Sequence, residues 1–203
     1  KIADKFSQKT NHKITLISGS SSSLLSMIVH GSPIDIFLSA DKARPLRLIE
    51  MKLADKKSLT NYANGQLAFL SPNVEIASIN QIIEHLKTQS GKLAIANPRL
   101  APYGLSSINF INESVIKNNN KQTLKSTLVM GNNVIQAMQF VTSNNAQSGF
   151  VSYSQIKQAN VTEYFYVLPK GSYTPIEQYG IITNKGSKNS VVTDLMSFIK
   201  NLI

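Results

Sequence analysis

Three polar turns stand where the sequence passes from a short apolar run into a helical pattern. The first is the serine run 18–26, in which Ser20 to Ser23 precede a helix with apolar positions from Leu24. Serine is a common N-cap residue, and the first turn of a helix carries unpaired N–H groups and partial positive charge. Such a turn can hold an oxyanion without a cationic side chain. The simpler alternative is a capped helix after a serine turn, and this run alone favours that alternative.

Two further turns favour an oxyanion-binding site over the simpler alternative of a capped helix. One follows the apolar run 93–96, where Pro102 suits the first turn of a helix and Gly104 lets the backbone come close to a ligand. The other is 131–134, in which one of two asparagines would cap a helix that carries Val134. In an open α/β sheet such turns gather at the carboxyl ends of the strands, where ligands bind. We therefore expect N–H and hydroxyl donors from three turns to converge.

The three turns contain no carboxylate, so the predicted site is rich in donors and poor in acceptors. A fully deprotonated tetrahedral dianion, such as molybdate, tungstate or sulfate, satisfies a site of this kind. Hydrogen phosphate brings a hydrogen that finds no good acceptor and loses roughly 1 to 3 kcal/mol. The sequence thus predicts binding of a dianion and discrimination against a protonated anion.

Short strands that alternate with helices are needed to position these turns. Nearly continuous apolar runs predict strands covered on both faces, and apolar residues at helical spacing predict helices over 79–86, 134–141 and 191–202. This alternation is typical of an α/β fold with mostly parallel sheets. The predicted strands are 14–17, 34–38, 67–70, 93–96, 128–130, 150–151 and 180–182.

The serine run and the segment 31–41, Gly-Ser-Pro-Ile-Asp-Ile-Phe-Leu-Ser-Ala-Asp, resemble the periplasmic molybdate-binding proteins of ABC transporters, members of the type II periplasmic binding protein superfamily. The turns after 93–96 and at 131–134, and the run 149–151, also follow the order and spacing of that family. The resemblance implies a non-enzymatic protein without a cofactor, which binds molybdate or tungstate and delivers it to a permease. It further implies a periplasmic location, or a lipid anchor outside the membrane, and we expect a monomer.

The resemblance also implies five candidate oxyanion ligands: Ser21, Tyr103, Val134, Ser152 and Tyr153. Ser21 matches a serine that donates its hydroxyl and backbone N–H, while Tyr103 and Val134 match positions that donate only the backbone N–H. Well-known members carry a tyrosine hydroxyl directly after the Gly-φ-Val strand (φ, apolar), where this sequence has Ser152. Tyr153 comes one place later and would need a bulge, so Ser152 is favoured. The alternative for Tyr103 is a surface aromatic at the rim with no ligand role. No metal ligand is implied, because the metal is held only as its oxyanion.

Two lobes are the architecture that the resemblance implies. It places 1–63 and 177–203 in lobe 1 and 64–176 in lobe 2, with hinge crossings near 62–65 and 175–180. The anion would bind between the lobes and stabilise their closed state. The family opens with a strand and a serine ligand that this sequence lacks, so the first strand is expected to be missing from this chain.

Composition excludes several other classes of protein. The 203 residues carry a net charge of +10 and contain no cysteine, which rules out disulfides and thiolate metal sites. The basic residues are scattered, with Lys56-Lys57 as the adjacent pair, so nucleic acid is not expected as a partner. The histidines, His12, His30 and His85, lack metal-ligand spacing. No apolar run approaches the roughly 18 residues of a membrane span, and no leader-like apolar segment opens the sequence.

Two alternative functions stay open at this point. A binding protein for sulfate or another oxyanion fits the same set of donors. The oxyanion-sensing effector domain of a transcription regulator shares the fold, but a regulator would need a helix-turn-helix segment, and none is present in these residues.

Overall fold

The computed structural model describes residues 2–116, 124, 126–162 and 164–201. The chain divides into two compact units: unit 1, which is Lys1–Asn64 with Glu177–Ile203, and unit 2, which is Gly65–Ile176. The chain passes from unit 1 to unit 2 and back at these two boundaries. In the part of the chain that is described, no helix has both the length and the apolar character needed to cross a membrane.

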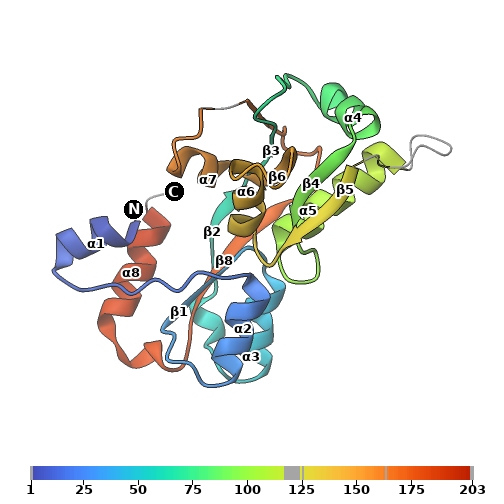
Figure 1. Ribbon diagram of the computed structural model, residues 1–203. Coiled ribbons are helices and arrows are strands. Elements are labelled where there is room, and N and C mark those ends of the chain that lie inside the picture. Colours follow the sequence, from blue (N-terminus) through green and yellow to red (C-terminus); the bar gives the residue numbers. More distant parts are fainter. Residues whose placement is uncertain (1, 117–123, 125, 163, 202–203) are drawn as a thin grey trace. The chain divides into compact units, whose positions relative to one another are not determined.

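Unit 1 contains a three-stranded sheet in the order β1-β8-β2. β1 runs antiparallel to β8, with Phe37 opposite Ile181, and both residues belong to a core that also contains Leu48 of α3. Helix α2 packs against α3, and Phe6 and Phe198 hold α1 against α8 with ring centroids 5.4 Å apart (Figure 1). The elements are α1 (Ile2–Thr10), α2 (Ser21–Val29), β1 (Ile36–Ser39), α3 (Ala43–Glu50), the 3-10 turn η1 (Lys56–Ser58), β2 (Thr60–Gly65), β8 (Ile176–Ile182), the 3-10 turn η3 (Gly186–Lys188) and α8 (Ser190–Asn201).

The predicted strand 14–17 is wrong. These residues form no strand, and the side chains of Leu16 and Ile17 are 65% and 49% exposed. A strand needs hydrogen-bond partners on a neighbouring strand, and β1, at the edge of the sheet, pairs only with β8 among the described residues. The apolar run therefore has no strand beside it and stays irregular.

Unit 2 contains a five-stranded sheet in the order β5-β4-β6-β3-β7. β4 runs parallel to β5 and β6, whereas β3 runs antiparallel to β6 and β7. The elements are β3 (Leu67–Leu70), α4 (Ile79–Thr88), β4 (Gly91–Ala96), α5 (Pro102–Ile111), the π-helical turn η2 (Asn112–Ile116), β5 (Ser126–Gly131), α6 (Val134–Thr142), β6 (Ser148–Ser152), α7 (Tyr153–Gln158) and β7 (Phe165–Val167).

Antiparallel pairs occur in both sheets, which corrects the expectation of mostly parallel sheets. In unit 2, β3 opposes the direction shared by its neighbours, and in unit 1, β1 and β8 are antiparallel. Parallel neighbours require a crossover connection, usually a helix. β3 follows β2 and β8 follows β7 directly in the chain, and in each case the preceding strand belongs to the other sheet, so neither strand enters its sheet through such a crossover.

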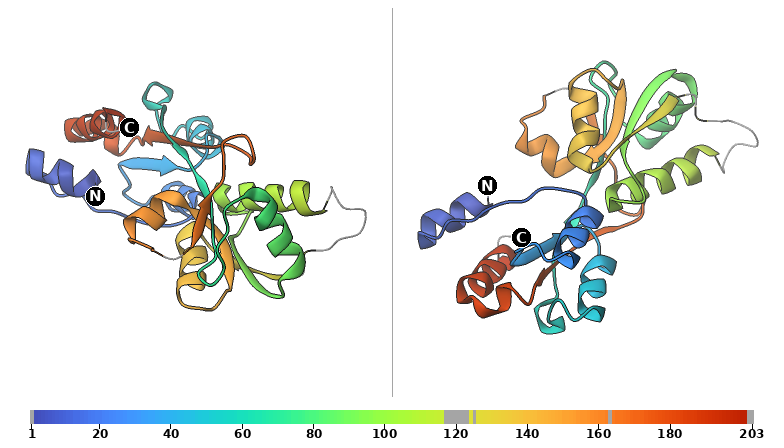
Figure 2. Two further views of the ribbon diagram at one scale, coloured as in Figure 1. Left: turned by 90° about the horizontal axis from the view of Figure 1, so that it is seen from above. Right: turned by 60° about the horizontal axis from the view of Figure 1, so that its bottom comes forward.

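Different helices cover the two faces of the unit 2 sheet (Figure 2). Phe69 of β3 lies opposite Phe150 of β6. The centroid of the Phe69 ring lies 5.6 Å from that of His85 in α4, and the centroid of the Phe150 ring lies 5.4 Å from that of Phe110 in α5. Successive strand residues point to opposite faces, and Val151 packs on the other face with residues of α6 and α7. β3 and β6 are buried along their full length, as continuous apolar runs predict for strands covered on both sides.

Burial of His85 gives the protein a predictable dependence of stability on pH. The His85 side chain is 9% exposed, and burial lowers its pKa because the charged imidazolium loses its hydration. The unfolded chain takes up a proton near its ordinary pKa of about 6.5, while the folded protein keeps this ring neutral to lower pH. The free energy of unfolding should therefore fall as the pH drops below that value. Urea denaturation across this range should show a weaker fall for His85→Leu than for the wild-type protein.

A matched control is the exposed His12. The His12→Gln variant should keep the wild-type dependence of the free energy of unfolding on pH. Equal slopes for the wild-type protein and His85→Leu would contradict the assignment of this acid sensitivity to His85.

Candidate functional site

The serine turn of unit 1 begins α2 and leaves a hydroxyl hydrogen available to a ligand. Ser20 is the N-cap, and its hydroxyl oxygen accepts the backbone N–H of Ser23 at 3.1 Å. Ser21 opens the helix, and its hydroxyl oxygen accepts the backbone N–H of Ala40 at 3.1 Å. That bond uses one lone pair of the Ser21 oxygen, so the hydroxyl hydrogen can still be donated. Ser21 is buried, and Ala40 fixes the position of its oxygen.

A charged pair lies beside this turn, and the sequence pattern did not reveal it. Arg44 of α3 donates two hydrogen bonds to the Ser22 hydroxyl oxygen, from Nε at 2.9 Å and from Nη2 at 2.7 Å. Its Nη1 forms an ion pair with the Asp41 carboxylate. The serine turn itself has no carboxylate, but Asp41 brings one into its surroundings, and Arg44 neutralises it. A cationic side chain therefore lies beside the serine turn, with its charge paired to Asp41.

The second candidate turn begins α5, with Pro102 as its first residue. Tyr103 follows and is 6% exposed, which excludes the interpretation of this residue as a surface aromatic at a rim. A Cβ atom at Gly104 would lie 2.1 Å from the backbone oxygen of Ala96, at the end of β4. Gly104 therefore allows α5 to pack closely against the end of β4.

The side chains of Ser152 and Tyr103 meet through their hydroxyl groups. Ser152 ends β6, and its Oγ donates to Tyr103 Oη at 3.0 Å. The same Oγ lies 2.8 Å from the Ser154 Oγ, and Ser152 is 3% exposed. A chain of three hydroxyl groups thus runs from the buried Tyr103 of α5 through the buried Ser152 at the end of β6 to the exposed Ser154 in the first turn of α7.

Tyr153 takes a different environment from Ser152. It begins α7 and does not belong to β6, and its ring packs against Phe165 of β7 with centroids 6.0 Å apart. The Lys157 Nζ lies 4.8 Å from the centroid of the Tyr153 ring. The Tyr153 ring therefore packs with residues of α7 and β7, apart from the hydroxyl chain.

The third turn is closed by a reciprocal pair of side chains. The Asn133 Oδ1 accepts the backbone N–H of Gln136 at 2.9 Å, and the Gln136 Oε1 accepts the backbone N–H of Asn132 at 2.7 Å. Asn133 is the N-cap, so α6 begins at Val134, and the pair differs from a standard capping box in that Gln136 accepts the N–H of the residue before the N-cap. The backbone N–H of a first helical residue has no acceptor within its own helix, so α6 does not use the Val134 N–H.

Three of the four candidate residues of unit 2, Tyr103, Val134 and Ser152, lie at or after the ends of strands at one edge of the sheet. β4, β5 and β6 are parallel neighbours, so their carboxyl ends lie together. The backbone N–H of Asn97 donates to the Gly131 carbonyl at 2.7 Å and joins the turns after β4 and β5. Tyr103, Val134 and Ser152 are therefore brought to the same edge, where α/β sheets bind ligands.

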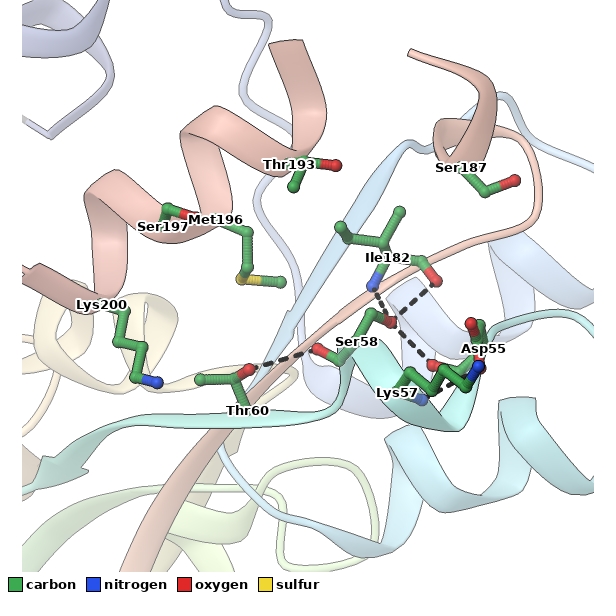
Figure 3. A pocket seen from close by; sticks show the side chains of 10 residues that line it. All are labelled: Asp55, Lys57, Ser58, Thr60, Ile182, Ser187, Thr193, Met196, Ser197 and Lys200. Carbon is green, nitrogen blue, oxygen red and sulfur yellow. Dashed lines mark hydrogen bonds between the residues drawn. The ribbon is translucent and has the colours of Figure 1, made fainter. Parts of the chain in front are cut away.

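A cavity of about 410 Å³ lies elsewhere in unit 1, among residues of η1, β2, β8 and α8 (Figure 3). Its Ser58 hydroxyl accepts the backbone N–H of Ile182 at 3.0 Å and donates to the Asp55 carbonyl at 2.7 Å. This hydroxyl joins η1 to β8, and no residue that lines the cavity belongs to the three turns. Among the described residues, no group of three or more His, Asp or Glu side chains is placed to hold a metal ion.

Comparison with known proteins identifies relatives over almost the whole chain. The family model for bacterial extracellular solute-binding proteins matches residues 1–201. The molybdate-binding protein ModA of Rhodobacter capsulatus is 33% identical over 197 residues, which cover 96% of this chain and 75% of that protein. ModA of Azotobacter vinelandii is 33% identical over 202 residues, which cover 98% of this chain and 78% of that protein.

Among solved structures, the periplasmic molybdate-binding protein of Azotobacter vinelandii matches with a TM-score of 0.84 at 29% identity, over 98% of this chain and 86% of that chain. These similarities confirm the α/β fold of the periplasmic-binding-protein type and the resemblance drawn from the serine run and 31–41. The relatives named here are binding proteins. The chain belongs to the bacterial extracellular solute-binding protein family.

Proposed function

We propose that the protein binds molybdate or tungstate as a tetrahedral dianion and delivers it, chemically unchanged, to the permease of an ABC transporter. Support comes from the 33% identity to molybdate-binding proteins over nearly the whole chain. The structural observation that carries the proposal is the buried Ser21 hydroxyl, whose oxygen is held by the Ala40 N–H and whose hydrogen is left to donate. In this role the protein is a monomeric periplasmic carrier, not an enzyme, and it needs no cofactor.

Four residues are proposed to bind the anion. Ser21 donates its hydroxyl and backbone N–H, and Tyr103 and Val134 donate their backbone N–H groups from the starts of α5 and α6. Ser152 is preferred to Tyr153 as the fourth, because it ends β6 beside Tyr103, while the Tyr153 ring is packed against Phe165 of β7. To donate to the anion, the Ser152 hydroxyl turns its single hydrogen away from Tyr103 Oη. All these donors are uncharged, so the helix starts supply the partial positive charge.

Donors of both units are proposed to bind the same anion. In this proposal units 1 and 2 are the two lobes, and the crossings near 62–65 and 175–180 are the hinge. An anion that is held by both lobes stabilises their closed arrangement, because the open arrangement offers it fewer donors.

Isothermal titration calorimetry with molybdate, tungstate, sulfate and hydrogen phosphate tests the proposal. We expect heats of binding with molybdate and tungstate and none with hydrogen phosphate. At a ligand concentration about 100 times Kd, molybdate should also raise the free energy of unfolding by about 2.7 kcal/mol. Absence of heat with both molybdate and tungstate would refute the proposal, and tighter binding of sulfate would reassign the ligand to sulfate.

A further inference from the structure

The contact between Arg44 and Ser22 joins α3 to α2, the preceding helix of unit 1, across 22 residues of sequence. The guanidinium group of Arg44, in α3, reaches the Ser22 hydroxyl oxygen, in the first turn of α2, with two nitrogen atoms at once. These bonds, at 2.9 and 2.7 Å, have the lengths of strong charge-assisted hydrogen bonds. Ser22 directly follows Ser21, the residue to which the proposed anion site assigns a hydroxyl donor.

Two accepted hydrogen bonds fill the acceptor capacity of a serine hydroxyl. The oxygen has two lone pairs and a single hydrogen. With both lone pairs of Ser22 occupied by Arg44, the hydroxyl can only donate, and donation is strengthened because hydrogen bonds in a chain polarise one another. Ser21 is biased in the same direction, since its oxygen accepts the Ala40 N–H. The start of α2 therefore offers hydrogens and few free lone pairs.

Asp41 holds the guanidinium group in this arrangement. Its Oδ2 pairs with the Arg44 Nη1, and its Oδ1 accepts the backbone N–H of Arg44 at 2.9 Å. The two side chains are each 20% exposed, and their charges cancel. Arg44 thus acts on the serine turn mainly by directing a hydroxyl hydrogen, and its positive charge is largely compensated before an anion arrives.

We propose that Arg44 is the positioning residue that makes the serine turn select fully deprotonated oxyanions. By filling both lone pairs of Ser22, Arg44 removes the acceptor that the hydrogen of a protonated anion, such as hydrogen phosphate, would need. This inference rests on the proposed function, because it concerns the selectivity of the same site. The purely structural alternative is that Arg44 only fastens α3 to α2.

The test compares the affinities for molybdate and hydrogen phosphate in the wild-type protein, Arg44→Gln and Arg47→Gln. Arg47 is the matched control, because it lies on the same helix, carries the same charge and pairs only with the exposed Glu50 in the described contacts. We expect Arg44→Gln to lower the ratio of molybdate to hydrogen phosphate affinity about tenfold, the loss of roughly one hydrogen bond. Arg47→Gln should leave the ratio within about twofold.

A double-mutant cycle with Ser22→Ala distinguishes an effect of Arg44 on the Ser22 hydroxyl from a purely structural contact between α3 and α2. If Arg44 acts through the Ser22 hydroxyl, Arg44→Gln should change the affinity ratio little in the Ser22→Ala background. Equal effects of Arg44→Gln in both backgrounds, or equal ratios for Arg44→Gln and Arg47→Gln, would overturn the inference while leaving molybdate binding intact. A wild-type protein that binds no oxyanion would overturn the proposed function and this inference together. Arg44→Lys keeps the charge but can place only one nitrogen on Ser22, so its ratio of molybdate to hydrogen phosphate affinity should lie between those of the wild-type protein and Arg44→Gln. This variant replaces Arg44→Gln in the test if Arg44→Gln does not fold.

Discussion

Replacing Gly104 by alanine should lower the free energy of unfolding by about 3 kcal/mol. The added Cβ would lie 2.1 Å from the backbone oxygen of Ala96 and 2.6 Å from its carbonyl carbon. Both atoms belong to the backbone at the end of β4, so no side-chain rotation relieves the clash, and α5 must move away from the sheet. Urea denaturation measures the loss. Molybdate affinity should fall as well, because α5 carries Tyr103.

Gly171 provides the control for this substitution within the same unit. It has φ +90, and a Cβ there would meet nothing within 4 Å. Gly171→Ala should therefore cost only the backbone strain of the left-handed region, about 1 kcal/mol. If both alanine variants lost the same stability, the close approach of α5 to β4 would not be the reason that position 104 holds glycine.

Removing the Ser21 hydroxyl should weaken molybdate binding about 100-fold. A hydrogen bond to a charged ligand contributes roughly 1.5 to 3 kcal/mol, and each 1.4 kcal/mol corresponds to a factor of ten in affinity. Ser21→Ala also leaves the Ala40 N–H without its acceptor, so the segment after β1 loses a contact with α2. Calorimetric titration with molybdate measures the affinity, and denaturation of the ligand-free variant measures the structural loss separately.

Ser26→Ala is the matched control on the same helix. Ser26 lies in the last turn of α2, where its hydroxyl is exposed and lies 3.3 Å from the His30 Nδ1. This variant should bind molybdate with nearly wild-type affinity. Wild-type affinity in Ser21→Ala would exclude the serine turn from the anion site.

The strands could be predicted from the sequence wherever their partners were also evident as apolar runs. The runs 67–70, 93–96 and 150–151 all lie in the buried sheet of unit 2. The run 14–17 is equally apolar but has no neighbouring strand, and strand formation depends on that distant partner. Apolar periodicity likewise predicted the helix α8 from Val191, Leu195 and Phe198. The buried residues of this helix are their neighbours Val192, Met196 and Ile199.

The candidate site was accessible to sequence reasoning where its signals are local. N-caps act over three residues, so the starts of α2 and α6 follow from serine and asparagine followed by helical periodicity. The contacts between Arg44 and Ser22 and between Ser152 and Tyr103 span 22 and 49 residues. Such contacts depend on how helices pack, and no local pattern of residue types encodes them.

The order of strands in unit 1 has a consequence for the order in which the chain folds. Unit 2 is one continuous stretch, so its core can close without any other part of the chain. β8 lies between β1 and β2 yet comes after the whole of unit 2 in the sequence. β1 and β2 can therefore form their sheet only when β8, more than a hundred residues further along the chain, lies between them. Such non-local pairing is slow, because closing a long loop costs conformational entropy. Completion of this smaller sheet should be the last step of maturation, long after its larger neighbour has formed.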